Sequence, residues 1–231
     1  MGDSGEHDAQ EVFRYRLSKV VGAAAVSLAL LFFLRGLPDN QAQVASVFAF
    51  TVLLWATEAL PLAVTAIMGT ALLVLVAGVD EKSAFKSFGD PIVLLFIGSF
   101  TLAKAFEANG LHERIARYVL RQRLATRSPM SSGEKGTVAI FFLVLALWLA
   151  PDTANVVLGK DHAWALFVNE HFTNAVAAVV GMALCYIVPA RGTESGRVLT
   201  WSQGRTIQWG TVMLFGGGLA LGDATIQSGL A

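Results

Sequence analysis

The sequence predicts an all-α integral membrane protein with about seven transmembrane helices and an inverted structural repeat. Composition, recurrent apolar stretches and the likeness between two of those stretches predict it. Of the 231 residues, 55% are hydrophobic and 15% are charged, and the mean hydropathy is +0.59. Soluble domains usually carry about a quarter charged residues. This composition excludes a soluble enzyme and indicates a bilayer protein.

The charge balance bounds the partners of the chain. It holds 17 Lys and Arg residues against 17 Asp and Glu residues, so no excess charge attracts nucleic acid. We therefore expect membrane lipid as a partner and no nucleic acid. The first ten residues are polar and acidic, and the apolar run after them is long and lacks a clear cleavage site. We interpret that run as a retained first span.

Seven stretches are candidates for crossing the membrane. A helix rises 1.5 Å per residue, so roughly 20 apolar residues cross the hydrocarbon core with every backbone group bonded. The candidates are residues 17–34, 43–60, 61–79, 91–108, 137–149, 171–189 and 206–222. The fifth is short before Pro151, and we expect it to continue as a broken or tilted helix through Leu158.

The distribution of basic residues predicts the sidedness. With the N-terminus in the cytoplasm, twelve basic residues are cytoplasmic and four are on the other side, as the positive-inside rule requires. The twelve are Arg14, Arg16, Lys19, Arg114, Arg117, Arg121, Arg123, Arg127, Lys135, Arg191, Arg197 and Arg205, and the four are Arg35, Lys82, Lys86 and Lys160. We expect a plasma or inner membrane location.

The domain boundaries follow from these spans. We predict a cytoplasmic N-terminal tail (1–16), a first repeat of four transmembrane helices and an interfacial helix (17–128), a linker (129–136), and a truncated second repeat of three helices (137–231). The interfacial helix is the arginine-rich stretch 111–127, whose apolar face includes Leu111, Ile115, Tyr118 and Val119. The alternative is a solvated helix that simply extends the fourth span.

An internal repeat appears when the chain is shifted by 119 residues. Residues 92–111 then pair with 211–230, and eight of the twenty pairs are identical. Hydrophobicity alone does not explain why Asn109-Gly110-Leu111 matches Ser228-Gly229-Leu230. In the predicted topology the two copies cross the membrane in opposite directions, as the inverted repeats of secondary transporters do.

Four charged residues lie in or beside the apolar stretches. Glu58 is a candidate for a transport role, because charge inside a membrane is costly, but Pro61 can open the next helix and make Glu58 a structural cap near its positive end. Lys104 and Glu107 are three residues apart and can pair on a helix. Asp223 occupies the repeat position of Lys104, so the two could interact.

The glycines and the cysteine favour packing over chemistry. Gly216, Gly217, Gly218 and Gly222 allow close helix approach, and Gly218 with Gly222 forms a small-xxx-small pair. We prefer packing to ligand binding for this cluster. Cys185 is the single cysteine and lies in an apolar run, so we expect it to fill space in the membrane.

No enzyme signature is present. His112-Glu113 lacks the second histidine of a zinc helix, since Ala116 stands at that place, and no Gly-x-Ser-x-Gly element occurs. The four histidines, His7, His112, His162 and His171, lie outside the apolar stretches or at their edges. We predict no catalytic residue, no metal ligand and no enzyme activity.

Three runs resemble the divalent anion/sodium symporter family. They are Trp55 to Leu62 with Thr65-Ala66, Phe88 through Asp90-Pro91 and Phe96 to His112, and Trp209 through Gly216-Gly217-Gly218 to Ala231. The resemblance implies a homodimer that carries dicarboxylate, citrate or sulfate with sodium as coupling ion, by moving a transport domain against a fixed scaffold.

The chain departs from the family pattern at one point. The resemblance implies two hairpins, each with a Ser-Asn-Thr motif that holds sodium and substrate, yet no Ser-Asn-Thr occurs in this sequence. The substrate-binding residues therefore stay unknown, and the part present resembles the scaffold. We predict a secondary active transporter of divalent anions, or alternatively a transport-incompetent scaffold or dimerisation fragment of one.

Overall fold

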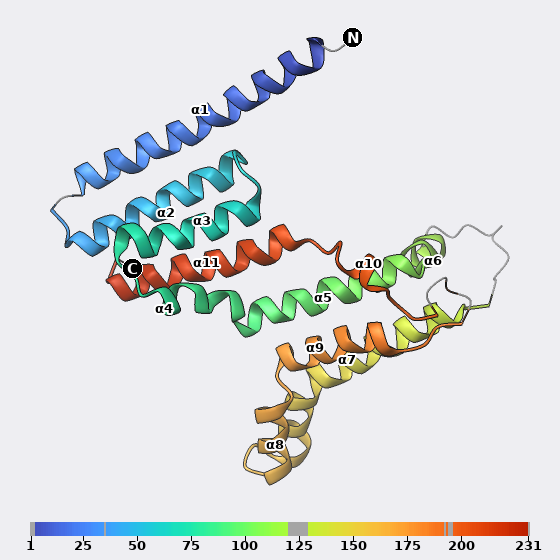
Figure 1. Cartoon of the computed structure of the whole chain (residues 1–231). Coiled ribbons are helices and arrows are strands. Elements are labelled where there is room, and N and C mark those ends of the chain that lie inside the picture. The colour runs from blue at the N-terminus through green and yellow to red at the C-terminus, as the bar shows by residue number, and fades with distance from the viewer. Residues whose placement is uncertain (1–2, 35, 120–128, 192, 194–195, 231) are drawn as a thin grey trace. The chain divides into compact units, whose positions relative to one another are not determined.

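The structure is a computed structural model of the chain that describes residues 3–34, 36–119, 129–191, 193 and 196–230 (Figure 1). These residues form helices joined by turns, with one isolated bridge between Pro189 and Arg197. The helices are α1 (Asp3–Phe33), α2 (Asp39–Thr57), α3 (Leu62–Ala77), α4 (Glu81–Lys86), η1 (Ser87–Gly89), α5 (Pro91–Ala108), α6 (Leu111–Val119), α7 (Ser132–Leu158), α8 (Ala163–His171), α9 (Asn174–Ile187), α10 (Trp201–Gly204) and α11 (Trp209–Ser228). The predicted all-α fold is confirmed.

Every predicted span falls on a helix, but not every helix is long and apolar enough to cross a bilayer alone. Among the described residues three segments qualify, Phe13–Phe33, Glu81–Ala108 and Ser132–Leu158, and the bent pair α8 and α9 makes up to four. The helix α3 is apolar but has 16 residues, which at 1.5 Å each is about 24 Å, less than the ~30 Å core. The number of crossings stays a prediction.

Contacts divide the chain into two compact units. Unit one holds residues 1–90 and 209–231, and unit two holds residues 91–208. Unit one thus includes α11 from the second predicted repeat, and unit two includes α5 and α6 from the first. The predicted boundaries 17–128 and 137–231 separate the two copies in sequence, whereas each packing unit contains helices from both copies.

In unit one, α1 packs against α2 through a narrow stripe. Lys19 Nζ donates to the Thr57 carbonyl at 2.8 Å, and Ser27 Oγ donates to the Ser46 carbonyl at 2.7 Å. Between these contacts Ala23 is buried. Interhelical hydrogen bonds of this kind add to packing where the surrounding lipid cannot bond polar groups. The polar tail predicted at residues 1–16 is helical from Asp3 onward, as part of α1.

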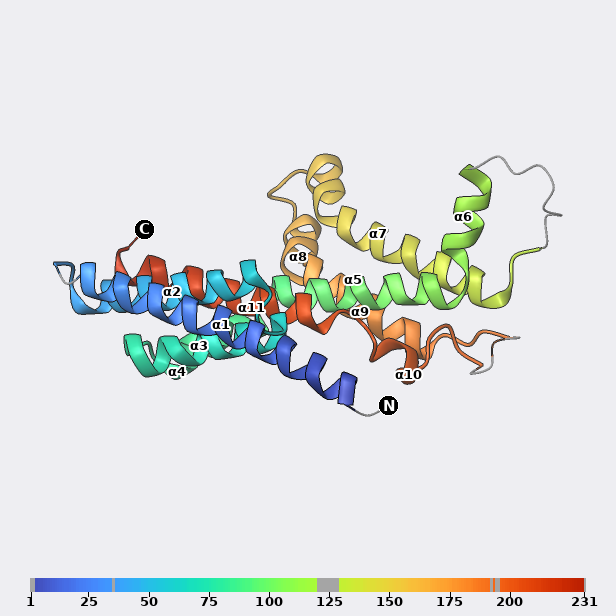
Figure 2. The ribbon, with the colours of Figure 1, turned by 90° about the horizontal axis from the view of Figure 1, so that it is seen from above.

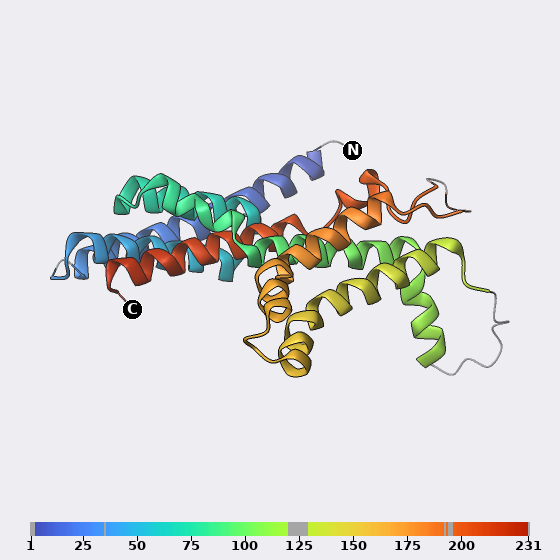
Figure 3. The ribbon, with the colours of Figure 1, turned by 90° about the horizontal axis from the view of Figure 1, so that it is seen from below.

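The helix α3 lies beside both α2 and α11 (Figure 3). A Cβ atom added to Gly69 of α3 would lie 2.6 Å from Thr51 Oγ1 of α2. A Cβ atom added to Gly217 of α11 would lie 2.8 Å from the Cβ of Ala66 of α3. Any side chain at these two positions would clash with the neighbouring helix. The close approach of α3 to α2 and of α11 to α3 therefore requires glycine there.

Unit two contains the same two kinds of contact. A Cβ added to Gly181 of α9 would overlap the side chain of Val144 of α7, and one added to Gly98 of α5 would lie 2.5 Å from the Ala178 carbonyl oxygen of α9. The short helix α6 follows α5 after a turn and leaves it at a steep angle (Figure 2). Of the predicted interfacial stretch 111–127, residues 120–127 lie outside the described residues.

The helix α7 begins earlier and ends later than the predicted fifth span. Ser131 caps its N-terminus, so the second half of the predicted linker forms its first turn. As expected, the helix continues through Pro151 to Leu158. The chain then returns along α7 as α8, where Asn155 and Asn169 exchange side-chain hydrogen bonds of 2.8 and 3.3 Å. A bend of 63° separates α8 from α9.

Candidate functional site

A set of polar side chains converges at one end of unit two, where α5 ends and α7 begins. Asn109 follows the last residue of α5, and its Nδ2 donates to the Ala105 carbonyl at 2.8 Å, the Val198 carbonyl at 2.8 Å and Thr137 Oγ1 at 3.1 Å. Thr137 is fully buried on α7. The amide thereby ties α5, α7 and the loop after α9 together.

An ion pair extends this set to α6. Arg114 Nε donates to Glu134 Oε1 at 2.6 Å, and Arg114 Nη2 donates to Glu134 Oε2 at 3.0 Å. The carboxylate also accepts from the Ser131 backbone N–H at 2.6 Å, while Ser131 Oγ accepts from the Glu134 N–H at 3.1 Å, a capping box at the start of α7. We call Asn109, Arg114, Ser131, Glu134 and Thr137 the polar cluster.

The contacts of the polar cluster indicate a structural role. Glu134 is 7% exposed, and an ionised carboxylate at that burial needs a cation and several donors. Arg114 and the Ser131 amide supply them. This cluster was not among the predicted site residues, although the spacing Ser131-x-x-Glu134 before an apolar run is a capping-box signal and Asn109 belongs to the repeated ending.

The predicted pair of Lys104 and Glu107 is confirmed. Lys104 Nζ donates to Glu107 Oε2 at 2.9 Å, with the two side chains 25% and 60% exposed. Asp223, at the matching repeat position of α11, accepts a hydrogen bond of 3.3 Å from Ser87 Oγ in unit one. An interaction between Asp223 and Lys104 stays a prediction.

Glu58 has a backbone role that differs from the predicted one. Its side chain is exposed, and its backbone is left-handed with φ 49°, where it ends α2 by donating its N–H to the carbonyls of Leu54 and Trp55. As expected, Pro61 stands directly before the first residue of α3. The residue therefore closes α2, whereas we expected it to cap the start of α3.

The four glycines of α11 fall into two pairs. Gly216 lies against the ring of Phe88, and Gly217 lies against Ala66, so packing explains both. An added Cβ at Gly218 or Gly222 meets no atom within 4 Å among the described residues. The predicted small-xxx-small pair is thus the open face of the helix within unit one.

Cys185, His162 and His171 contact neighbouring groups in the structure. Cys185 is fully buried in an apolar cluster with Leu102 and Leu199, as expected. His162 Nδ1 accepts from the Trp164 N–H at the start of α8, and His171 lies 2.9 Å from the Phe167 carbonyl. Within the described part of the chain, no group of three or more His, Cys, Asp or Glu residues could hold a metal ion.

The local structure agrees with a repeat. Gly110 after α5 and Gly229 after α11 both have left-handed backbones, with φ 68° and 73°. The contact of Gly98 with Ala178 matches that of Gly217 with Ala66, and a second sequence signal accompanies it. Shifted by 112 residues, 62–73 pairs with 174–185, and six of the twelve pairs are identical. The repeat in sequence thus includes α3 and α9, while its inversion stays a prediction.

Comparison with known proteins gives a family model that matches both halves of the chain and curated relatives that match about half of it. A family model for the sodium:sulfate symporter transmembrane region matches residues 15–128 and again residues 117–231. A sodium-dependent dicarboxylate transporter, SdcS, of Staphylococcus aureus strain USA300 is 33% identical over 114 residues, and the protein of that name from strain bovine RF122 is 32% identical over 114 residues. Each match covers 49% of this chain and 20% of the relative.

Proposed function

This chain belongs to the sodium:sulfate symporter family, and we propose that it takes part in sodium-coupled secondary active transport of a small divalent anion across a membrane. Dicarboxylate, citrate and sulfate are the anions proposed. The observation that carries the proposal is the family match, which covers both halves of the chain. The name of the matched Staphylococcus aureus relatives, sodium-dependent dicarboxylate transporter, favours a dicarboxylate.

The architecture supports a membrane transport protein in two ways. Its long helices are apolar on the outside, with large exposed hydrophobic side chains such as Leu28 of α1 and Val156 of α7. Its helix pairs approach closely at glycines, which is how helices associate tightly where lipid replaces water. We propose a plasma or inner membrane location with a cytoplasmic N-terminus, and a homodimer as the working assembly.

A scaffold role is the second candidate, and the polar cluster favours it. The carboxylate of Glu134 is bonded to Arg114 and Ser131, and the amide of Asn109 donates to three oxygens. These groups are committed to holding α5, α6 and α7 together. The chain spans about a fifth of the length of the curated relatives it matches, so transport by those relatives does not by itself assign transport to this chain.

Uptake into proteoliposomes separates the two candidates. Purified chain is reconstituted, and entry of radiolabelled succinate, citrate and sulfate is measured with an inward sodium gradient, with equal sodium on both sides, and in protein-free vesicles. Accumulation that requires the sodium gradient supports transport by this chain. Uptake no greater than in protein-free vesicles, from protein that is folded and inserted, rejects transport and supports the scaffold role.

A further inference from the structure

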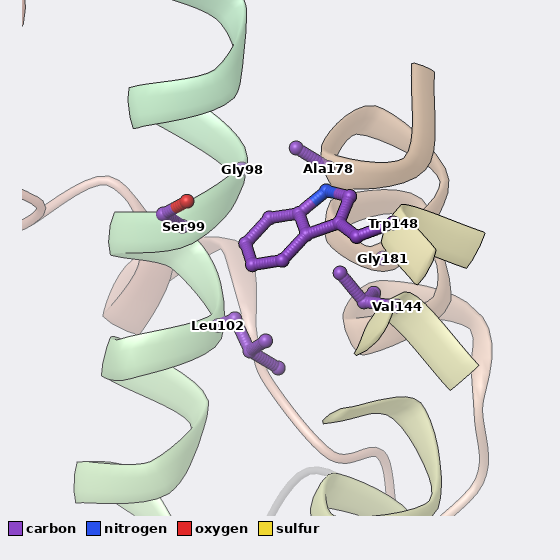
Figure 4. A pocket seen from close by; sticks show the side chains of 7 residues that line it. All are labelled: Gly98, Ser99, Leu102, Val144, Trp148, Ala178 and Gly181. Atoms are coloured by element: carbon purple, nitrogen blue, oxygen red, sulfur yellow. The ribbon is translucent and has the colours of Figure 1, made fainter. Parts of the chain in front are cut away.

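A groove opens between α5 and α7 in unit two. Its volume is about 310 Å³, and its walls include Ser99, Ala103 and Phe106 of α5 and Phe141, Leu145 and Trp148 of α7. The two helices meet near the polar cluster and diverge from it (Figures 2 and 3), and both pack against α9. At the base of the groove, a hollow of about 10 Å³ lies beside Gly98, Ala178 and Gly181 (Figure 4).

The lining favours an apolar occupant. The polar edge of Trp148 is already used, because its Nε1 donates to the Asn174 carbonyl at 3.1 Å and its ring lines the groove. Phe106 and Phe141 contact edge to face, with ring centroids 5.5 Å apart. A charged or strongly polar ligand would lose its hydration here and find only the Ser99 hydroxyl as a partner, which is unfavourable.

The size of the groove selects among apolar occupants. From Ser99 to Phe106 is seven residues, or about 10 Å along the helix axis. A transmembrane helix is ~10 Å across, so a length of about 10 Å of one occupies about 800 Å³, far more than the groove volume of about 310 Å³. A single hydrocarbon chain, whose carbons keep roughly 4 Å from their neighbours, occupies about 200 Å³ over the same length.

We propose that this groove binds one acyl chain of a bilayer phospholipid. Both walls lie within the predicted spans 91–108 and 137–149, at a depth where acyl chains are the surrounding medium. The length of about 10 Å takes up part of the ~15 Å hydrocarbon depth of one leaflet. The bound chain fills space that would otherwise leave Trp148 and Phe141 without contacts on one side. The inference depends on membrane insertion and is independent of transport.

Photolabelling in proteoliposomes tests the proposal. Vesicles contain phosphatidylcholine with a diazirine in one acyl chain, and labelled peptides are mapped. We expect labelling concentrated on residues 99–106 and 141–148. The substitution Ala103→Phe places a ring in the groove and should lower that labelling about tenfold, the ratio that corresponds to roughly 1.4 kcal/mol. The control is Ala139→Phe, at an exposed α7 position outside the groove lining, which should leave the labelling unchanged.

Three results would overturn the proposal. They are labelling spread evenly over all exposed helices, labelling of the groove that persists in Ala103→Phe, and disulfide-linked dimers formed through Ser99→Cys in a Cys185→Ala background. The last result would assign the groove to a second copy of the chain. A second check uses the tryptophan of the groove itself: vesicles contain acyl-brominated phosphatidylcholine, and wild type is compared with Trp148→Phe. The fraction of tryptophan fluorescence that the brominated chains quench should be smaller in Trp148→Phe than in wild type. An equal or larger quenched fraction in Trp148→Phe would contradict an acyl chain bound beside Trp148.

Discussion

Arg114 and Glu134 form a two-point contact between α6 and α7, with N–O distances of 2.6 and 3.0 Å. The Arg114 side chain is 33% exposed, whereas the side chain of Glu134 is 9% exposed. Parallel hydrogen bonds from a guanidinium fix both the separation and the orientation of the partner carboxylate. The pair therefore sets where α6 begins relative to α7.

Replacing Arg114 by Ala should destabilise the protein. Glu134 would keep its buried charge but lose its cation, at a cost of about 1 to 3 kcal/mol, below the range for fully buried pairs because Arg114 is partly solvated. The matched control is Arg117→Ala. Arg117 pairs with Glu113 at 3.7 Å, and the two side chains are 55% and 65% exposed. Losing this exposed pair should lower the free energy of unfolding by less than about 0.5 kcal/mol. Thermal denaturation midpoints in detergent measure both effects. Equal midpoints for the two variants would contradict a stabilising role of the Arg114–Glu134 pair.

The glycine contacts predict opposite outcomes for two glycine pairs. Gly98→Ala and Gly217→Ala should each destabilise by about 1 to 3 kcal/mol, because the new methyl meets backbone or Cβ atoms at 2.5 to 2.8 Å. Gly218→Ala and Gly222→Ala meet no atom within 4 Å and should be neutral or stabilising by up to about 1 kcal/mol. Denaturation midpoints of the four variants decide it, and a uniform effect would argue against close packing at these sites.

Sequence reasoning predicted the helices well and the site poorly. Apolar stretches fix where helices form, so each predicted span coincides with one. The polar cluster needs Asn109, Glu134 and the Val198 carbonyl, which lie up to 89 residues apart and meet only after packing. Side-chain pairs within one helix, such as Lys104 with Glu107, are set by helical spacing and were predictable. The identical Gly and Ala residues of α3 and α9 can also be found in the sequence. They align at a shift of 112 residues, whereas α5 and α11 align at a shift of 119 residues.

The left-handed Glu58 offers a test of what its carboxylate does. Glycine adopts φ 49° without steric cost, so Glu58→Gly should stabilise the end of α2 by about 1 kcal/mol. Glu58→Ala removes the same carboxylate but keeps the Cβ atom, and should not stabilise. If the two variants shift the denaturation midpoint equally, the charge of Glu58 matters and its backbone conformation does not.

The turn after α5 provides a similar comparison without steric contacts. Gly110 has φ 68°, and an added Cβ meets no atom within 4 Å. Gly110→Ala should therefore cost about 1 to 2 kcal/mol through the backbone alone. Gly89→Ala is the control, because its site is equally open and lacks a positive φ. Denaturation midpoints in detergent should fall for the first variant only, and a matching fall in the control would remove the conformational explanation.

The two ends of α7 test the sidedness of the chain. Lys135 lies in the first turn of this helix and Lys160 is the second residue after its end at Leu158, so a membrane-crossing α7 places them on opposite sides. Cys185 is buried, and a Cys185→Ala background removes its thiol. In that background Lys160→Cys should react with a membrane-impermeant maleimide on intact cells, whereas Lys135→Cys should react only after permeabilisation. Reaction of both from outside would show that α7 does not cross, and the reverse pattern would place the N-terminus outside.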